Sequence, residues 1–358
     1  GSTGWSATYE TALGVRLYGI NSKADLLAFR SAHGGKDSEH TELIKDAEAY
    51  AASIAPYQVD GWIALNADIE AITGEEFTNS YCNFIHRLKE KFDGNGHTIN
   101  LDVTGKNTAT ILSFFQHIDA SVKNVNFAGR MEQTAKDVCV MATLAQQVST
   151  AATVENVTSS VDITTGRKNC TIGGILAVGC IANATLKDCS YSGTIKVTDL
   201  SNGIGGIVGA NTAAGSGNPS LLTIDNCVFG GKIEYTSTSH NAASRFGGII
   251  GDQGRNCVMQ NCTNSGQMVF NLDCTRIATV NTSGIGGLVG RCNATTSGYT
   301  MSTTVKDCAF TGSIVFNNAS SDQPKDYIGK IIGSLMGPLY SLAYALQAMT
   351  EKDGAAPA

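Results

Sequence analysis

Apolar and small residues alternate with polar residues in several stretches of the chain. After Cys189 they recur at every second position, and the same spacing follows Cys308. The positions are Tyr191, Gly193, Ile195 and Val197 in the first stretch, and Phe310, Gly312, Ile314 and Phe316 in the second. A period of two residues is that of a β-strand with one buried face, not that of a helix. The pattern therefore predicts strands.

Two short motifs recur along the chain and mark an internal repeat. The first places two glycines between apolar residues, at 172–176, 204–209, 246–251 and 285–290, with a degenerate copy at 328–333. The second ends in Cys or Val after Asn or Asp, and its last residues are Val125, Val157, Cys189, Cys227, Cys262 and Cys308. Steps of 32, 32, 38, 35 and 46 residues between them are typical of a solenoid.

These observations predict an all-β fold: a single-stranded, right-handed parallel β-helix of about six to seven coils. The handedness follows from the general rule for connections between parallel strands. We expect three regions: a cap with two helices and the first strands at 1–91, the β-helix at 92–338, and a C-terminal helix and tail at 339–358.

The residue before each Cys or Val of the second motif is Asn or Asp, and these types tolerate left-handed backbone well. We expect them at a bend between strands, with side chains that form a ladder from repeat to repeat: Asn124, Asn156, Asp188, Asn226, Asn261 and Asp307. The Cys and Val residues then form an inward column. Side chains stacked in this way are too far apart for a disulfide, so we expect buried, reduced thiols.

Open ends of stacked strands invite aggregation, so we expect a helical cover at both ends. Ser22 and Asp25 form a capping pattern that predicts a helix through Phe29. A second, amphipathic helix is expected from Glu39 to Ile54, ended by Pro56. The C-terminal helix is predicted from the spacing of Leu339, Leu342, Leu346 and Met349.

Composition and charge narrow the possible partners. Only 16% of the residues are charged and the net charge is −6, which argues against nucleic acid. The glycine motif lacks the third glycine of a dinucleotide-binding loop and opens no helix, so we expect no nucleotide and no cofactor. No apolar run is long enough to span a bilayer. We expect a monomer.

The sequence assigns no catalytic, cofactor-binding or metal-binding residue. Asp93 and His97 lie in a D-G-N-G-H segment that we interpret as a tight turn. His86 and His117 are interpreted as packed or surface residues. The pair Tyr81-Cys82 has no catalytic histidine near it in the sequence, so we expect no cysteine nucleophile there.

Acidic residues are candidates for a catalytic role. Alignment of the repeats after the glycine motif places four residues in one row: Ala210, Asp252, Arg291 and Ser334. We interpret Asp252 and Arg291 as a surface ion pair, and Asp188 and Asp225 as turn residues. The strands show no row of paired acids, although loops at 211–220, 236–244 and 293–301 leave a loop-borne site open.

The repeated motifs resemble the GLUG motif of Bacteroides-type bacterial cell-surface proteins. Three earlier segments fit the same family: Ile20–Phe29 resembles its first segment, Trp62–Ile69 its L-x-x-D-I strand, and Phe92–Ile99 its F-D-G-N-G-H-T-I coil. The resemblance covers roughly Ile20 to Gly337 and implies a parallel β-helix that is exported and attached to the cell surface or extracellular. The chain begins without Met, so we expect membrane contact only through a removed lipoprotein leader.

We therefore expect a non-catalytic, adhesin-like protein that binds an extended partner, either a glycan or an extracellular protein. Loops rich in Ser, Thr and Asn with few charges favour this function. The alternative is a polysaccharide-acting β-helix enzyme, a lyase or a glycoside hydrolase. Two acids about 5–10 Å apart in a groove would distinguish it.

Overall fold

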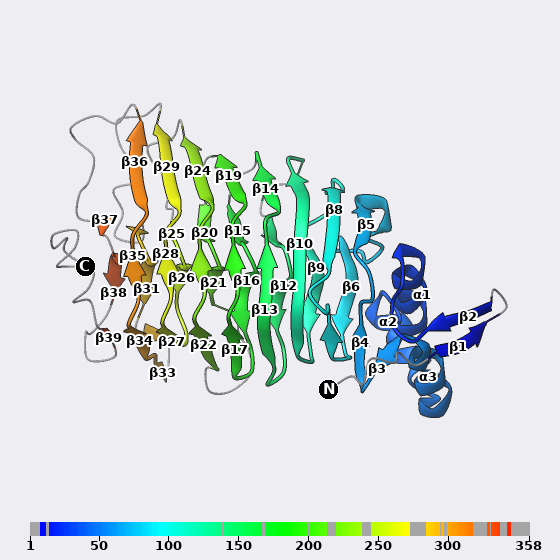
Figure 1. Ribbon diagram of the computed structural model, residues 1–358. Helices are drawn as coiled ribbons and strands as arrows, with labels where there is room; N and C mark the ends of the chain where they lie inside the picture. The colour runs from blue at the N-terminus through cyan, green and yellow to red at the C-terminus, as the bar shows by residue number, and fades with distance from the viewer. Residues whose placement is uncertain are drawn as a thin grey trace.

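The computed structural model describes residues 8–11, 14–135, 137, 139–166, 169–198, 201–212, 220–237, 245–272, 284–293, 295–296, 299–317, 328–329, 331–336 and 342–344. These residues form a long row of parallel strands with short helices at its N-terminal end (Figure 1). An antiparallel hairpin of β1 (Thr8–Thr11) and β2 (Gly14–Leu17) precedes the helices.

The helices follow their capping residues. Helix α1 (Lys23–His33) begins where predicted, and the Ser22 hydroxyl accepts the Asp25 N–H at 3.2 Å. The single helix expected from Glu39 to Ile54 is two helices, α2 (Asp37–Leu43) and α3 (Ala47–Ile54). Asp46 causes the break, because its side chain accepts the Ala49 N–H at 3.0 Å and starts α3. Two 3₁₀ turns follow: η1 (Ala55–Tyr57) and η2 (Gly74–Glu76).

Most strands belong to two large sheets. The fourteen-stranded sheet is parallel. In spatial order it contains β37 (Ile328–Gly329), β30 (Gly284–Gly286), β25 (Arg245–Gly247), β20 (Ser201–Gly205), β15 (Cys170–Gly173), β11 (Val140–Ala142), β9 (Ile111–Ile118), β12 (Ala145–Val148), β16 (Leu176–Cys180), β21 (Val208–Asn211), β26 (Ile250–Gln253), β31 (Val289–Asn293) and β38 (Ile332–Met336), and β6 (Asn83–Leu88) pairs with β9.

The second sheet is mostly parallel, and its pairing closes on itself in a barrel-like way. Its strands are β3 (Gln58–Val59), β4 (Trp62–Ala64), β5 (Ile69–Thr73), β7 (Phe92–Asp93), β8 (Thr98–Thr104), β10 (Val122–Gln133), β13 (Thr153–Ser159), β14 (Asp162–Thr165), β17 (Ala184–Lys187), β18 (Ser190–Tyr191), β19 (Thr194–Thr198), β22 (Leu221–Asp225), β23 (Val228–Phe229), β24 (Lys232–Ser237), β27 (Asn256–Gln260), β28 (Thr263–Asn264), β29 (Gln267–Leu272), β34 (Thr303–Lys306), β35 (Ala309–Phe310), β36 (Ser313–Asn317) and β39 (Leu342–Tyr344). A small hairpin pairs β32 (Thr295–Thr296) with β33 (Tyr299–Thr300).

The predicted fold class is wrong in its specific form. We expected a single-stranded, right-handed parallel β-helix with a helix at each end, whereas the strands form two large sheets, one of them barrel-like. Two long strands explain the difference. β9 pairs with both β11 and β12, and β10 pairs with both β13 and β14, so that separate faces join into continuous sheets. The coarser prediction is supported, because the repeat-like arrangement of parallel strands is consistent with a solenoid.

The prediction of a C-terminal helix is also wrong at the residues of this segment that the structure describes. Leu342–Tyr344 is strand β39, which pairs in parallel with β34. The edge of β34 offers unpaired backbone groups, and these favour a further strand over a helix at this place. Leu339, Leu346 and Met349 lie outside the described residues.

The bend predicted at Asn and Asp is confirmed. All six residues of the predicted ladder have φ between 51° and 56°, in the left-handed region. The side-chain ladder is formed in part: the Asn156 amide donates to Asn124 Oδ1 at 2.9 Å and the Asn226 amide to Asp188 Oδ1 at 2.7 Å. The Asn261 amide instead reaches Asp225 Oδ1 at 3.0 Å.

The cysteine column is buried and reduced, as predicted. Cys189, Cys227, Cys262 and Cys308 are at most 3% exposed and carry free thiols. Each thiol donates to the carbonyl two residues earlier, as Cys262 does to Gln260 at 3.2 Å. A hydrogen bond with the preceding thiol, together with burial, raises the pKa of Cys227, Cys262 and Cys308 above its ordinary value.

The repeated glycines lie where backbone and side chains approach closely. A Cβ at Gly206 would meet the Gly248 carbonyl oxygen and the Phe229 ring, and one at Gly174 would meet the Gly206 carbonyl oxygen and the Tyr191 ring. These glycines are therefore packing positions, in agreement with the sequence interpretation that they do not form a phosphate loop.

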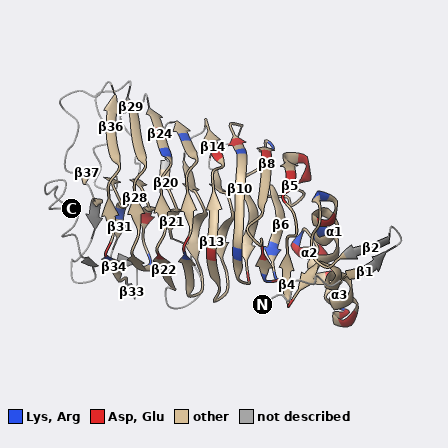
Figure 2. Cartoon of the chain, viewed as in Figure 1, with Lys and Arg blue, Asp and Glu red and all other residues tan. Residues whose placement is uncertain are grey.

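Charged side chains are scattered along the strands in both signs (Figure 2). In the second sheet, one line of register partners alternates in charge from Asp93 to Asp225 and continues through the neutral Gln260 to Lys306. This charge column consists of Asp93, Lys123, Glu155, Lys187, Asp225, Gln260 and Lys306, which pair in register. The Lys123 ammonium lies 3.9 Å from the Asp93 carboxylate. Opposite charges on adjacent strands stabilise such a pairing.

Candidate functional site

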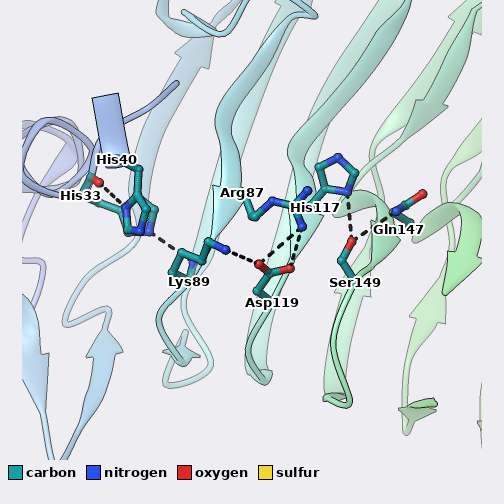
Figure 3. Close-up of polar contacts among 8 residues, drawn as sticks. All are labelled: His33, His40, Arg87, Lys89, His117, Asp119, Gln147 and Ser149. Carbon is teal, nitrogen blue, oxygen red and sulfur yellow. Dashed lines mark hydrogen bonds and ion pairs between the residues drawn. The ribbon is translucent and has the colours of Figure 1, made fainter. Parts of the chain in front are cut away.

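A row of polar side chains lies at the C-terminal ends of β6, β9 and β12 of the fourteen-stranded sheet, in the strands and directly after them. Its members come in two sets with a constant step of 30 residues, and we call them together the polar row: Arg87, His117 and Gln147, and Lys89, Asp119 and Ser149 (Figure 3). The first set pairs in register across the three strands. Between the two sets lie Leu88, Ile118 and Val148, which are fully buried in the core. Alternation along the strands therefore holds both sets on the outer face.

One end of the polar row is an ion-pair network. The Arg87 guanidinium donates to Asp119 Oδ1 at 3.1 Å, and the Lys89 ammonium donates to Asp119 Oδ2 at 2.6 Å. The Asp119 side chain is only 8% exposed, whereas those of Arg87 and Lys89 are 27% and 37% exposed. One carboxylate thus faces two cations, so this end carries an excess positive charge beside solvent.

The other end is a hydrogen-bonded group of neutral side chains. His117 Nδ1 lies 3.0 Å from the Ser149 hydroxyl, which also accepts from the Gln147 amide at 3.2 Å. Burial, followed by the charges of Arg87 and His86, lowers the pKa of His117 to about 4. His117 is therefore neutral at pH 7.

The structure brings together His86 and His117, which the sequence analysis interpreted as packed or surface residues. Their rings are 5.3 Å apart at an angle of 67°. The His86 backbone N–H donates to the Gly35 carbonyl at 2.7 Å, which joins β6 to the segment between α1 and α2. Burial lowers the pKa of His86 as well. The polar row thus lies against the helical part of the chain.

Two further side chains of this region have unused hydrogen-bonding capacity. Gln146 Oε1 and Thr150 Oγ1 are buried and have no hydrogen-bond partner within the described residues. Both flank members of the polar row on the same segment. Buried polar atoms generally form a hydrogen bond with the protein or with a bound group. The two oxygen atoms are therefore available to accept a hydrogen bond from such a group.

The other candidates from the sequence have structural surroundings. Asp93 Oδ1 accepts the Asn95 N–H at 2.8 Å and the His97 N–H donates to the Gly94 carbonyl at 2.8 Å, which confirms the tight turn. Cys82 is 1% exposed, and burial raises the pKa of its thiol. Asp252 pairs with Arg291, as predicted. Asp188 and Asp225 both accept from neighbouring turn asparagines.

The described part of the chain holds no group of three His, Cys, Asp or Glu side chains arranged to bind a metal ion. Within the same part, no helix has the length and apolar character needed to cross a membrane. The loop segments 213–219 and 238–244, where the sequence left a site open, lie outside the described residues.

Sequence reasoning missed most of the polar row. Arg87, Lys89, Asp119 and Ser149 belong to repeats that lack the double-glycine motif, so nothing in those motifs aligned them. The signal that would have found them is the 30-residue step, which brings residues of adjacent parallel strands side by side.

Comparisons with known proteins leave the family open. No family model matches the chain, and no curated protein matches it. Among solved structures it is similar to a crystal structure of a putative immunoglobulin A1 protease from Bacteroides ovatus. The identity is 16%, the match covers 82% of this chain and 83% of that chain, and the TM-score is 0.48. A likeness at this level assigns neither family nor activity, and the resemblance to GLUG-motif proteins stays a prediction.

Proposed function

We propose that the protein is a non-catalytic, adhesin-like protein that binds an extended ligand, a glycan in the first instance, along the polar row. The observation that carries the proposal is the register of the row. Six polar side chains at the C-terminal ends of three adjacent parallel strands present an ammonium, a guanidinium, a carboxylate, an amide, a hydroxyl and an imidazole on one face. A glycan chain offers hydroxyl and ring oxygens that match such donors.

The electrostatics of the row favour binding over catalysis. Both carboxylate oxygens of Asp119 are engaged by cations, Oδ1 by Arg87 at 3.1 Å and Oδ2 by Lys89 at 2.6 Å, which favours a structural role over a role as general acid. His117, with a pKa of about 4, is too weak a base to activate Ser149 efficiently near neutral pH. Both side chains are suited to hold a ligand rather than to move a proton.

We also propose that the protein is exported and works as a monomer at the outer surface of a bacterial cell or outside it, where an extracellular protein is the other partner class. This part of the proposal rests on the resemblance of the repeated motifs to GLUG-motif surface proteins, in which a lipoprotein anchor is common. The proposal includes neither nucleic acid nor nucleotides among the partners.

A glycan and matrix-protein array tests the proposal, run together with a reducing-end assay on the same polysaccharides. The variant Arg87→Gln removes the charge but keeps a polar side chain, and Arg130→Gln on β10 is the matched control, since Arg130 is an exposed arginine paired with Asp102. We expect retention on one ligand class, a loss of at least about tenfold in Arg87→Gln, corresponding to about 1.4 kcal/mol, and no loss in Arg130→Gln.

Two outcomes would contradict the proposal. Equal retention by Arg87→Gln and the wild type would show that the ligand binds elsewhere. Release of reducing ends that disappears in His117→Gln would instead establish the alternative, a polysaccharide-acting enzyme.

A further inference from the structure

His33 occupies a buried junction between the helices and the strands. It is the last residue of α1 and is 0% exposed. Its Nδ1 lies 2.9 Å from the Gly34 carbonyl, and its Nε2 lies 3.2 Å from the backbone nitrogen of Lys89. A carbonyl only accepts and a backbone N–H only donates, so Nδ1 carries the proton and Nε2 the lone pair. The junction therefore holds His33 as one neutral tautomer.

The groups around His33 oppose a second proton. From α2, the His40 ring lies 4.5 Å away and its Nδ1 donates to the His33 carbonyl at 2.7 Å. From α3, Tyr50 packs edge-on at 6.4 Å and donates its hydroxyl to Glu90 Oε1 at 2.8 Å. From the segment after β6, Lys89 adds a positive charge. Burial lowers the pKa of His33 to about 4; the bond to the Gly34 carbonyl acts in the opposite direction, and His40 and Lys89 lower the pKa further.

Lys89 connects this junction to the polar row. Its backbone N–H is bound by His33, while its ammonium donates to Asp119 Oδ2 at 2.6 Å. Asp119 in turn accepts from Arg87. Figure 3 shows this continuous path from the end of α1 to the strand residues. Loss of the bond at His33 therefore frees the backbone of the same residue that compensates Asp119.

We propose that His33 is an acid-sensitive latch that docks α1 and α2 against β6, and that its protonation breaks the bond to Lys89 and releases these helices from the sheet. The proton arrives at Nε2, the atom that accepts the Lys89 N–H, so the two cannot coexist. The resulting imidazolium is buried beside His40 and Lys89, with the Glu90 carboxylate already engaged by Tyr50. Opening of the junction hydrates the charge. The latch operates whether or not the polar row binds a glycan.

Hydrogen exchange of the full chain, without ligand, tests the latch. Since the pKa of His33 is near 4 when docked and near 6.5 when exposed, linkage predicts that opening of α1 increases about 20-fold between pH 7 and pH 5. The measurement compares peptides from α1 and α2 with peptides from β13 and β17, after correction for intrinsic exchange. We expect the increase in the helices and not in the strands.

The variant His33→Gln keeps an acceptor for Lys89 but cannot titrate, so we expect its helix opening to change less than about threefold over the same pH range. His97→Gln is the matched control, because His97 contacts Asp68 in the turn before β8, and it should behave as the wild type. An unchanged wild-type helix, or a full increase in His33→Gln, would overturn the proposal.

A measurement on the wild type covers the case in which His33→Gln does not fold. The imidazole signals of His33 can be followed by NMR as the pH falls. We expect His33 to stay neutral at pH 5.5 and to gain its proton together with the exchange of α1. Titration near pH 6.5 with the helices still protected would refute the latch.

Discussion

Arg291 on β31 holds Asp252 on β26 through two hydrogen bonds of 2.9 Å, one from Nε and one from Nη2. The two residues are register partners on adjacent strands, as the alignment of the repeats predicted. The sequence interpretation of a surface pair needs one correction, because their side chains are only 15% and 7% exposed. A second cation, Arg245, lies 3.8 Å from the same carboxylate.

The variant Asp252→Asn tests how much this ion pair contributes to the stability of the fold. Removal of the carboxylate leaves two partly buried guanidinium groups without their charge partner, so we expect the free energy of unfolding to fall by about 2–3 kcal/mol. Urea denaturation measures the change. Glu42→Gln is the control, since the Glu42–Lys45 pair is 73% and 68% exposed and should contribute less than about 0.5 kcal/mol. Equal effects of the two substitutions would refute the expected difference.

The variant Gly206→Ala tests the close approach at the repeated glycines. The added Cβ meets the Gly248 carbonyl oxygen and the Phe229 ring, both fixed in the core, so we expect a loss of about 3 kcal/mol or failure to fold. Gly230→Ala is the matched control, because the nearest atom to its Cβ is Ser265 Oγ at 3.5 Å. Thermal unfolding followed by circular dichroism compares the two. A stable Gly206→Ala protein would show that the repeat tolerates a side chain there.

The buried thiols should be chemically silent until the chain unfolds. The cysteines at ten described positions are buried and free, and thiols that are buried with raised pKa react slowly with disulfide reagents. We expect little reaction in the native protein at pH 8 and recovery of most of the eleven cysteines after denaturation without reductant. Thr185→Cys, on a partly exposed strand position, is the control for reagent access. Recovery of a single thiol from the denatured chain would indicate disulfides instead.

Acid should weaken the fold before the carboxylates titrate fully. The pKa of His33 and of His117 is about 4 in the folded chain, below the 6.5 of an exposed histidine. The unfolded chain therefore binds more protons between pH 6.5 and pH 4, so stability is lost as the pH falls through this window.

The variant His117→Gln isolates one of these contributions. It retains a hydrogen-bonding group for Ser149 but removes the titration, so the acid loss of stability should shrink by on the order of 1 kcal/mol, with the partial exposure of His117 taken into account. Urea midpoints at pH 7, 5.5 and 4.5 measure the slope. An unchanged slope would place the titration elsewhere.

The sequence predicted what local rules determine. Asn226 and its counterparts tolerate the left-handed backbone that the bends require, and the repeat step of the later strands placed Asp252 beside Arg291. The sequence did not predict the polar row, because His117 and Ser149 come together through the pairing of β9 with β12, and no repeated motif marks that pairing. Apolar spacing alone predicts a helix at Leu342, whereas the structure pairs this residue with Thr303 at the edge of β34.

The charge column has a consequence for how the repeats find their neighbours. Nearly identical strands can pair with the wrong repeat, and a chain that skipped one would bring Lys123 against Lys187 and Glu155 against Asp225. Like charges directly opposite each other destabilise a strand pair, whereas the correct neighbour always offers the opposite sign over these four positions. The alternating charges thus favour pairing of each strand with the adjacent repeat during folding, and they disfavour pairing with the repeat after it.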